Sequence, residues 1–334
     1  MQNSKILISQ ALKTIRGNVE RTGDPLGMKT VYWNRWMDGL ELPREGKTVL
    51  FTARMYQMLP YVVQATEMAA SAKPFVPMLS VRALSKIAEI ANAAVADPVL
   101  RLRARSAREI RDRSEGALRG IVSALNAAGV YPAYLHEKEP YSGVLLYDLG
   151  MEEAVKPLAR SVFSRLKSAG AETVVTVDPH TTFMLRKVYP QYVPGFDLDV
   201  RHYLEVLAGS DSAVRKPEAG SIPEKVVLHD SCVMTRELEC VEPVRTVLSR
   251  LGIEVLEPEN RGKDTACCGG PVEYAYQDLS RSISSIRAKE LAGVCRDVVV
   301  TCPICLVNLM KHEKTLGIRI WDAGEILEKS FDLG

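Results

Sequence analysis

The seven cysteines are the residues of this 334-residue chain whose type and spacing most directly indicate chemistry. All lie between residues 232 and 305. Five form a pattern of one cysteine, an adjacent pair after 34 intervening residues, and a Cys-x-x-Cys motif after another 33 intervening residues: Cys232, Cys267, Cys268, Cys302 and Cys305. The other two, Cys240 and Cys295, are most simply small buried apolar residues. Because the total is odd and no secretory signal is visible, a disulfide framework is disfavoured, and metal binding or redox chemistry is the leading interpretation.

Several kinds of centre could use these thiols. Structural zinc sites take four ligands, often from two Cys-x-x-Cys knuckles, and only one such knuckle is present here. A cubane iron–sulfur cluster also takes four cysteines. Five converging thiolates, two of them adjacent, suit a larger or distorted iron–sulfur assembly better. A thioredoxin-like interpretation accounts for Cys302 and Cys305 but leaves the other three unexplained.

The elements around the cysteines indicate where they lie. The run KVVL at 225–228 and the run DVVV at 297–300 predict buried strands, each leading into a cysteine. Pro303 suits the first turn of a helix that continues over 304–311, and a second helix is predicted over about 272–291. Ligands of open α/β sheets bind beyond the carboxyl ends of strands, and helix N-termini favour a negatively charged cluster. His229 and Asp230 could either donate hydrogen bonds to such a centre or cap the following turn.

The strings HDSCVMTR, CCGGP and VVVTCPICLVNL resemble the cysteine-rich CCG domain. That domain occurs in the B-type and D-type subunits of heterodisulfide reductases and in iron–sulfur subunits of glycolate, lactate and anaerobic glycerol-3-phosphate dehydrogenases. The resemblance implies one non-cubane [4Fe–4S] cluster, with zinc as the less favoured alternative. By the same resemblance, the ligands are Cys232, Cys267, Cys268, Cys302 and Cys305.

The family domain usually occurs twice in one chain, and the sequence contains a trace of a first copy. TVDPHT at 176–181 aligns with VTCPIC at 300–305, and PYSG at 140–143 aligns with ACCG at 266–269. All five ligand positions of that copy are then lost, at Ala53, Tyr141, Ser142, Asp178 and Thr181. The emptied copy is a structural platform in one interpretation. In the other, Asp178, His180 and Tyr141 bind a substrate or another metal.

The expected fold class is α/β, with two pseudo-symmetric βα (Rossmann-like) domains of the cysteine-rich type. We expect a helical N-terminal arm over 1–46 and a degenerate first domain over 47–205, with a helical insertion at about 62–128. The intact, cluster-binding domain is expected over 222–330. The arm segment at 23–28, followed by Trp33 and Trp36, resembles the linker that follows a ferredoxin module in longer relatives. That module is absent, which implies a separate ferredoxin-like iron–sulfur subunit as partner.

The resulting functional hypothesis is an oxidoreductase, an iron–sulfur redox subunit of a heterodisulfide reductase-like complex that passes electrons to a disulfide or sulfur-carrier substrate. One alternative is an electron-transfer subunit of a flavin-dependent glycolate, lactate or glycerol-3-phosphate dehydrogenase, with a flavoprotein partner. Another is a zinc-binding structural protein. The formal net charge of +2 and the 25% of charged residues argue against nucleic acid and match an ordinary soluble protein. A cytoplasmic location is expected, with indirect membrane association through partners left open.

Overall fold

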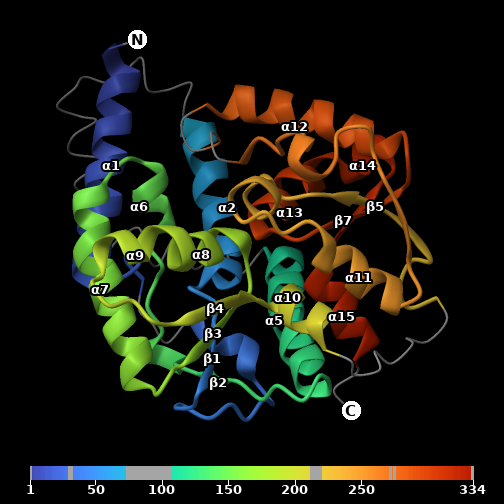
Figure 1. Cartoon of the computed structure of the whole chain (residues 1–334). Coiled ribbons are helices and arrows are strands. Elements are labelled where there is room, and N and C mark those ends of the chain that lie inside the picture. The colour runs from blue at the N-terminus through green and yellow to red at the C-terminus, as the bar shows by residue number, and fades with distance from the viewer. Residues whose placement is uncertain are drawn as a thin grey trace.

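The computed structural model describes residues 2–28, 33–72, 107–210, 220–270, 273 and 276–331. It contains two parallel four-stranded sheets with helices around them, which confirms the α/β fold expected from the sequence (Figure 1). The first sheet has the order β2-β1-β3-β4, from Ala133–Tyr134, Thr48–Phe51, Thr173–Thr176 and Asp199–His202. The second has the order β6-β5-β7-β8, from Glu254–Leu256, Lys225–His229, Asp297–Val300 and Arg319–Asp322. We call residues 48–209 the first half and residues 225–330 the second half.

In both halves each strand is followed by helical structure. In the first half the helices are α2 (Met55–Ala72), α5 (Arg108–Ala127), α6 (Val144–Asp148), α7 (Glu152–Ser168), α8 (Pro179–Phe183), α9 (Tyr189–Tyr192) and α10 (Tyr203–Gly209). In the second half they are α11 (Glu242–Arg250), α12 (Gln277–Ala292), α13 (Pro303–Leu309), α14 (Glu313–Leu316) and α15 (Ala323–Ser330). A π-helical turn, η6 (Val233–Glu237), follows β5. The predicted strand at 297–300 is confirmed, whereas α12 begins at Gln277, later than the predicted residue 272.

The two halves share their strand register as well as their strand order. In the first sheet Thr176 pairs with Phe51 on one side and with His202 on the other. In the second sheet Val300 pairs with His229 and with Asp322 in the same way. His202 and Asp322 each cap the next helix through a reciprocal capping box, which satisfies backbone N–H groups of its first turn. The shared register supports the duplication inferred from the sequence.

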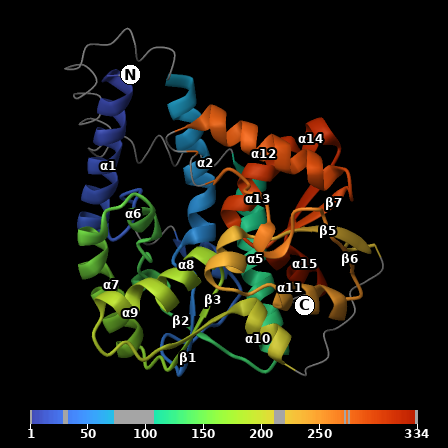
Figure 2. The ribbon, with the colours of Figure 1, turned by 45° about the horizontal axis from the view of Figure 1, so that its top comes forward.

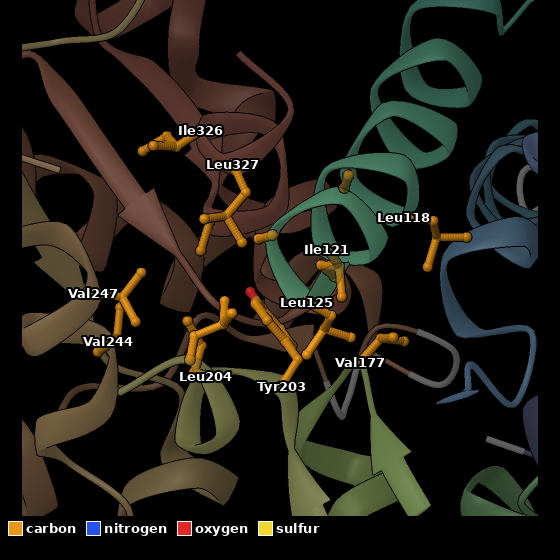
Figure 3. Close-up of a cluster of buried hydrophobic side chains, with 14 of the residues drawn as sticks. Leu118, Ile121, Leu125, Val177, Tyr203, Leu204, Val244, Val247, Ile326 and Leu327 are labelled. Atoms are coloured by element: carbon orange, nitrogen blue, oxygen red, sulfur yellow. The ribbon is translucent and has the colours of Figure 1, made fainter. Parts of the chain in front are cut away.

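The halves are joined by a continuous apolar core. Figure 3 shows Ile121 and Leu125 of α5 beside Tyr203 of α10, in the same cluster as side chains of α11 and α15. Helices α5 and α15 approach closely, since a Cβ atom on Gly120 would lie 2.2 Å from the Gly324 carbonyl oxygen. Arg113 of α5 reinforces this contact by donating to Glu325 at 2.7 Å. The interface therefore fixes the two sheets relative to each other.

The N-terminal arm begins with the helix α1 (Gln2–Thr22), as expected, and the buried Trp33 and Trp36 follow it. The arm is fixed to the first half by a buried ion pair, with Asp24 Oδ2 3.9 Å from Arg54 Nη1. The insertion predicted at about 62–128 contains the second part of α2 and all of α5, and its part at 73–106 lies outside the described residues. Helix α5 is part of the core between the halves rather than an appendage (Figures 1 and 2).

Candidate metal centre

The chain places its cysteines where strands end and helices begin. Strand β5 ends at His229, and Cys232 stands immediately before the π-helical turn η6. Strand β7 ends at Val300, and Cys302 is the N-cap residue of α13, with Pro303 at the first helical position as predicted. Adjacent parallel strands bring these two ends to the same edge of the sheet.

The cysteine pair reaches this edge through a glycine turn. Gly269 has φ +82°, and a Cβ atom there would lie 2.5 Å from the Ser280 carbonyl oxygen of α12. A Cβ atom on Gly270 would lie 2.2 Å from Ile304 Cγ2 and 3.4 Å from Cys268 Sγ. Only glycine therefore fits between α12 and α13 here, and the two glycines let the loop carry Cys267 and Cys268 against α13.

The five sulfurs that the sequence analysis singled out meet at one place. Hydrogen bonds join neighbouring thiols in the order Cys232, Cys267, Cys268, Cys305 and Cys302. Cys268, Cys302 and Cys305 are buried, whereas Cys232 and Cys267 are half-buried at the side open to solvent. All seven cysteines are free thiols. The sulfur cluster is thus enclosed by protein on one side and accessible on the other.

Contacts within the sulfur cluster favour thiolates at two positions. The thiol of Cys232, and then that of Cys268, hydrogen-bonds to Cys267 and lowers its pKa well below the ordinary value, and the Gly269 N–H donates to the same sulfur at 3.3 Å. Burial alone would raise the pKa of Cys302, but hydrogen bonds from Cys305 and His180 hold it well below its ordinary value. The donating thiols, including that of Cys232, correspondingly have raised pKa values. Thiolates are the form of cysteine that binds metals.

His229 presents a ring N–H to the sulfur cluster. Its Nδ1 accepts from Arg287 Nε at 3.0 Å, which leaves Nε2 as the protonated nitrogen, and Nε2 has no partner among the described residues. A ring nitrogen of His229 lies within 4.8 Å of Cys268 Sγ and Cys305 Sγ. Burial and then the Arg287 charge lower the pKa of His229 to about 3, so the ring is a neutral donor. Arg287 is fully buried on α12 and was not identified from the sequence. The sequence feature that could have indicated it is its helical spacing from Ser280 and Ser284, which are buried on the same helix.

The sequence left open whether Asp230 donates a hydrogen bond to the centre or caps the following turn. In the structure its side chain accepts hydrogen bonds from other elements of the second half. Its carboxylate accepts from Arg245 at 2.8 and 3.0 Å and from the Gly262 N–H at 2.7 Å. As an acceptor it ties the strand end before Cys232 to α11 and to the loop that leads to Cys267. Arg245 in turn pairs with Glu257, and sequence reasoning had not identified it.

One contact to the sulfur cluster comes from the first half. His180 is the second residue of α8 and hydrogen-bonds to Cys302 across the interface. Burial alone would lower the pKa of His180, but this hydrogen bond and the charges of Cys302, Asp178 and Asp148 raise it to about 9. The first half therefore supplies a cationic ring beside the second half's thiolate. Cys240 and Cys295 lie apart from the cluster, Cys240 buried as expected and Cys295 half-buried with its sulfur 3.6 Å from the Lys225 carbonyl.

The corresponding place in the first half holds no cysteine, since none precedes residue 232. Gly143 and Gly269 both have φ +82°, which aligns Tyr141 and Ser142 with the cysteine pair as predicted. The strand register, however, aligns Phe51 with His229, so the residue that corresponds to Cys232 is Arg54 rather than Ala53. The sequence alignment was one residue out at this position because no cysteine marks it.

Comparisons with known proteins can be set against this geometry. Residues 226–310 match the cysteine-rich domain family, CCG. The chain is 29% identical, over 66% of its length, to a probable iron–sulfur-binding oxidoreductase of Bacillus subtilis, of which it spans 32%. It is 32% identical, over 59% of its length, to a probable membrane-anchored ferredoxin of Chromohalobacter salexigens, of which it spans 30%.

A third relative is a subunit of the dihydromethanophenazine:CoB–CoM heterodisulfide reductase of Methanosarcina acetivorans, 29% identical over 58% of this chain and 49% of that protein. The chain thus spans from 30% to 49% of the length of these relatives. Among the described residues, no helix combines the length and the apolar character needed to cross a membrane. The segment from 226 to 310, which holds all five clustered sulfurs, matches the cysteine-rich CCG domain.

Proposed function

We propose that this chain is the iron–sulfur redox subunit of a heterodisulfide reductase-like complex and binds one non-cubane [4Fe–4S] cluster. The observation that carries the proposal is the meeting of five free thiols at the carboxyl ends of β5 and β7. The proposed ligands are Cys232, Cys267, Cys268, Cys302 and Cys305.

The donor set fits such a group. The five sulfurs contact one another in turn. Among the described residues, the group of possible metal ligands at this place holds His229, Cys268 and Cys305 and no carboxylate. Thiolates select iron–sulfur clusters or zinc over hard cations. Five exceed the four ligands of a structural zinc site. The unpartnered N–H of His229 and the N-terminus of α13 point positive charge at the same place, as an anionic cluster requires.

When bound, the cluster would supply electrons one at a time. The net reaction proposed is reduction of a disulfide: the S–S bond breaks, and two electrons and two protons convert it into two thiols. The chain's own residues would hold the cluster, exclude water from its buried side and leave an approach near Cys232 and Cys267, the two half-buried cysteines. The names of the relatives, an iron–sulfur oxidoreductase and a heterodisulfide reductase subunit, support this chemistry.

The test is measurement of iron, acid-labile sulfide and zinc on anaerobically purified protein, with EPR of an oxidised sample. We expect about four irons and four sulfides per chain, the composition of the proposed cluster. Reduction of a small aryl disulfide by a dithionite-reduced viologen should then depend on the protein. About one zinc without iron would contradict the proposal. Iron without disulfide reduction would instead favour an electron-transfer subunit of a flavin-dependent dehydrogenase.

A further inference from the structure

One arginine lies entirely inside the second half, beside the sulfur cluster. Arg287 of α12 is 0% exposed, although a guanidinium keeps its charge in proteins and is costly to bury. Three atoms of its side chain donate: Nε to His229 Nδ1 at 3.0 Å, Nη1 to Glu290 at 2.8 Å and Nη2 to Thr265 Oγ1 at 3.4 Å. Well-packed apolar side chains often stabilise an interior as well as a buried ion pair does. The buried charge therefore calls for a reason beyond stability.

The partners of Arg287 hold its guanidinium in one orientation. The carboxylate of Glu290 also accepts from Asn260, whose backbone N–H and side-chain amide donate to it at 2.9 and 3.0 Å. Thr265 Oγ1 donates onward to the Asp230 carbonyl, at 3.0 Å, just after the end of β5. Because both Nη atoms are engaged by groups that are themselves held in place, Nε stays directed at the histidine ring.

This contact fixes which nitrogen of His229 carries the proton. Arginine has five N–H donors and no acceptor, so the ring can meet Nε only with a lone pair on Nδ1. In a neutral ring the proton is then on Nε2, which is buried and has no partner among the residues that the structure describes. A ring nitrogen lies within 4.8 Å of Cys268 Sγ and Cys305 Sγ, and Nδ1 is already engaged by α12. The nitrogen left for the sulfurs is Nε2, and it faces them as a donor.

The opposite tautomer would give the same residues a different chemistry. With the proton on Nδ1, His229 would turn a lone pair toward Cys268 and Cys305, and these three donors lie close enough together to share one metal ion. A neighbouring thiolate, that of Cys267 or Cys302, would complete a Cys₃His set, which is an ordinary four-ligand site for zinc. Histidines that ligate metals donate their other N–H to a carboxylate, a carbonyl or water, all of which are acceptors. A guanidinium offers no acceptor.

We propose that Arg287 is a positioning residue that holds His229 in the Nε2–H tautomer, so that the ring donates to the iron–sulfur site and cannot become a zinc ligand. The proposal rests on the proposed function for the identity of the group that receives this hydrogen bond. The tautomer itself is a property of the chain's own residues. It also explains the buried charge, since a neutral side chain able to accept as well as donate would permit either tautomer.

The tautomer is measured directly on the metal-free, full-length chain. With ¹⁵N-labelled histidine, long-range ¹H–¹⁵N correlation spectra distinguish a protonated ring nitrogen from one that carries a lone pair, and His229→Gln identifies the signals by their loss. We expect the proton of His229 on Nε2 and the lone pair on Nδ1. A proton on Nδ1 would overturn the proposal. Because the decisive spectrum is that of the wild-type chain, the result does not depend on an Arg287 variant that folds.

Zinc affinity tests the consequence, with two substitutions that differ in one respect. Arg287→Gln supplies an oxygen that can accept from Nδ1–H, whereas the matched control Arg287→Lys keeps a cation with donors only. Zinc is titrated into the metal-free proteins against a chromophoric chelator. We expect Arg287→Gln to bind zinc about tenfold more tightly than wild type, and Arg287→Lys to bind it as wild type does. Adding His229→Leu to Arg287→Gln should abolish the gain, whereas His229→Leu alone should leave the affinity of wild type unchanged.

Three results of the titration would overturn the proposal. They are an unchanged affinity in Arg287→Gln, a gain that survives His229→Leu, and weaker zinc binding when His229→Leu is made in the wild-type chain. None of them depends on which metal the purified protein holds. Zinc in place of iron in the wild-type protein would refute the proposed cluster, and the spectrum and the order of zinc affinities would still decide the role of Arg287.

Discussion

The two halves of the molecule share a strand order, a register and two glycines at φ +82°, yet their strand ends carry different chemistry. Around the second sheet five thiols converge. Around the first, the corresponding positions hold the side chains Arg54, Tyr141, Ser142, Asp178 and Thr181. Loss of sulfur has not left the first half apolar, because Ser142 Oγ, Asp178 Oδ2 and Thr181 Oγ1 are buried polar atoms without a partner among the described residues.

The difference shows which parts of the fold depend on the proposed centre. The first half forms its sheet and its helix starts without cysteines, and Asp178 caps α8 through the Thr181 N–H at 2.9 Å. Cys302, at the same place in the second half, makes no side-chain cap. The cap in one half and the thiolate in the other are therefore alternative occupants of one strand-to-helix turn. The architecture tolerates both, and only the cysteine version offers the thiolate that the proposed iron–sulfur cluster requires.

The largest expected contrast comes from mutating this shared position in each half. Cys302→Ser should remove most of the bound iron, because the proposed cluster loses a central ligand. Asp178→Ala should leave the iron content unchanged and cost about 1 kcal/mol through loss of the helix cap. Iron analysis and urea unfolding of both variants, with Cys240→Ala as the control, check this. Iron loss in Asp178→Ala would mean that iron binding depends on this residue of the first half, contrary to our inference.

Arg54 and Cys232 occupy corresponding positions in the two halves. Here the substitution in the first half should cost more stability than the one in the second half. Arg54 is 3% exposed, lies 3.9 Å from Asp24, and donates to the Glu139 carbonyl. Arg54→Met would leave the buried Asp24 without its partner, at a cost of about 3–5 kcal/mol. Cys232→Ser should lower the iron content but change the unfolding free energy of the metal-free protein by less than about 1 kcal/mol. A metal-free Arg54→Met protein as stable as wild type would show that the ion pair does not fix the arm.

Glu139 makes the free energy of unfolding depend on pH, and the neutral variant Glu139→Gln should lack this dependence. Burial raises the pKa of Glu139 from 4.5 to about 7, although Thr52 and Tyr134 donate to its carboxylate. Between those values the folded chain binds more protons than the unfolded chain, so this group makes stability fall as the pH rises from about 4.5 to 7. Relative to wild type, Glu139→Gln should gain about 3 kcal/mol across that window. Denaturant unfolding of both proteins at several pH values measures it; a constant difference would contradict the raised pKa.

Sequence reasoning found the five cysteines because each stands in a local string that a strand or helix start explains. It could not find Arg287, whose partner His229 is 58 residues away, nor the contact between Tyr56 and Asp322, which are 266 residues apart and meet only when the halves pack. The one-residue error at Ala53 has a related cause. In the first half no ligand marks the end of β1, and only the pairing of Phe51 with Thr176 fixes the register.

The smallest expected contrast concerns the paired glycines, Gly143 and Gly269. Both need φ +82°, so alanine is strained at either, by roughly 1–2 kcal/mol. A Cβ atom on Gly143 would meet only the flexible end of Leu158, at 2.9 Å, whereas one on Gly269 would lie 2.5 Å from the Ser280 carbonyl oxygen. Because backbone cannot yield as a side chain can, Gly269→Ala should cost about 1–3 kcal/mol more than Gly143→Ala. It should also lower iron content, since the loop would lift from α12. Equal unfolding free energies for the two variants would mean that the close approach of the second half's loop to α12 is not required.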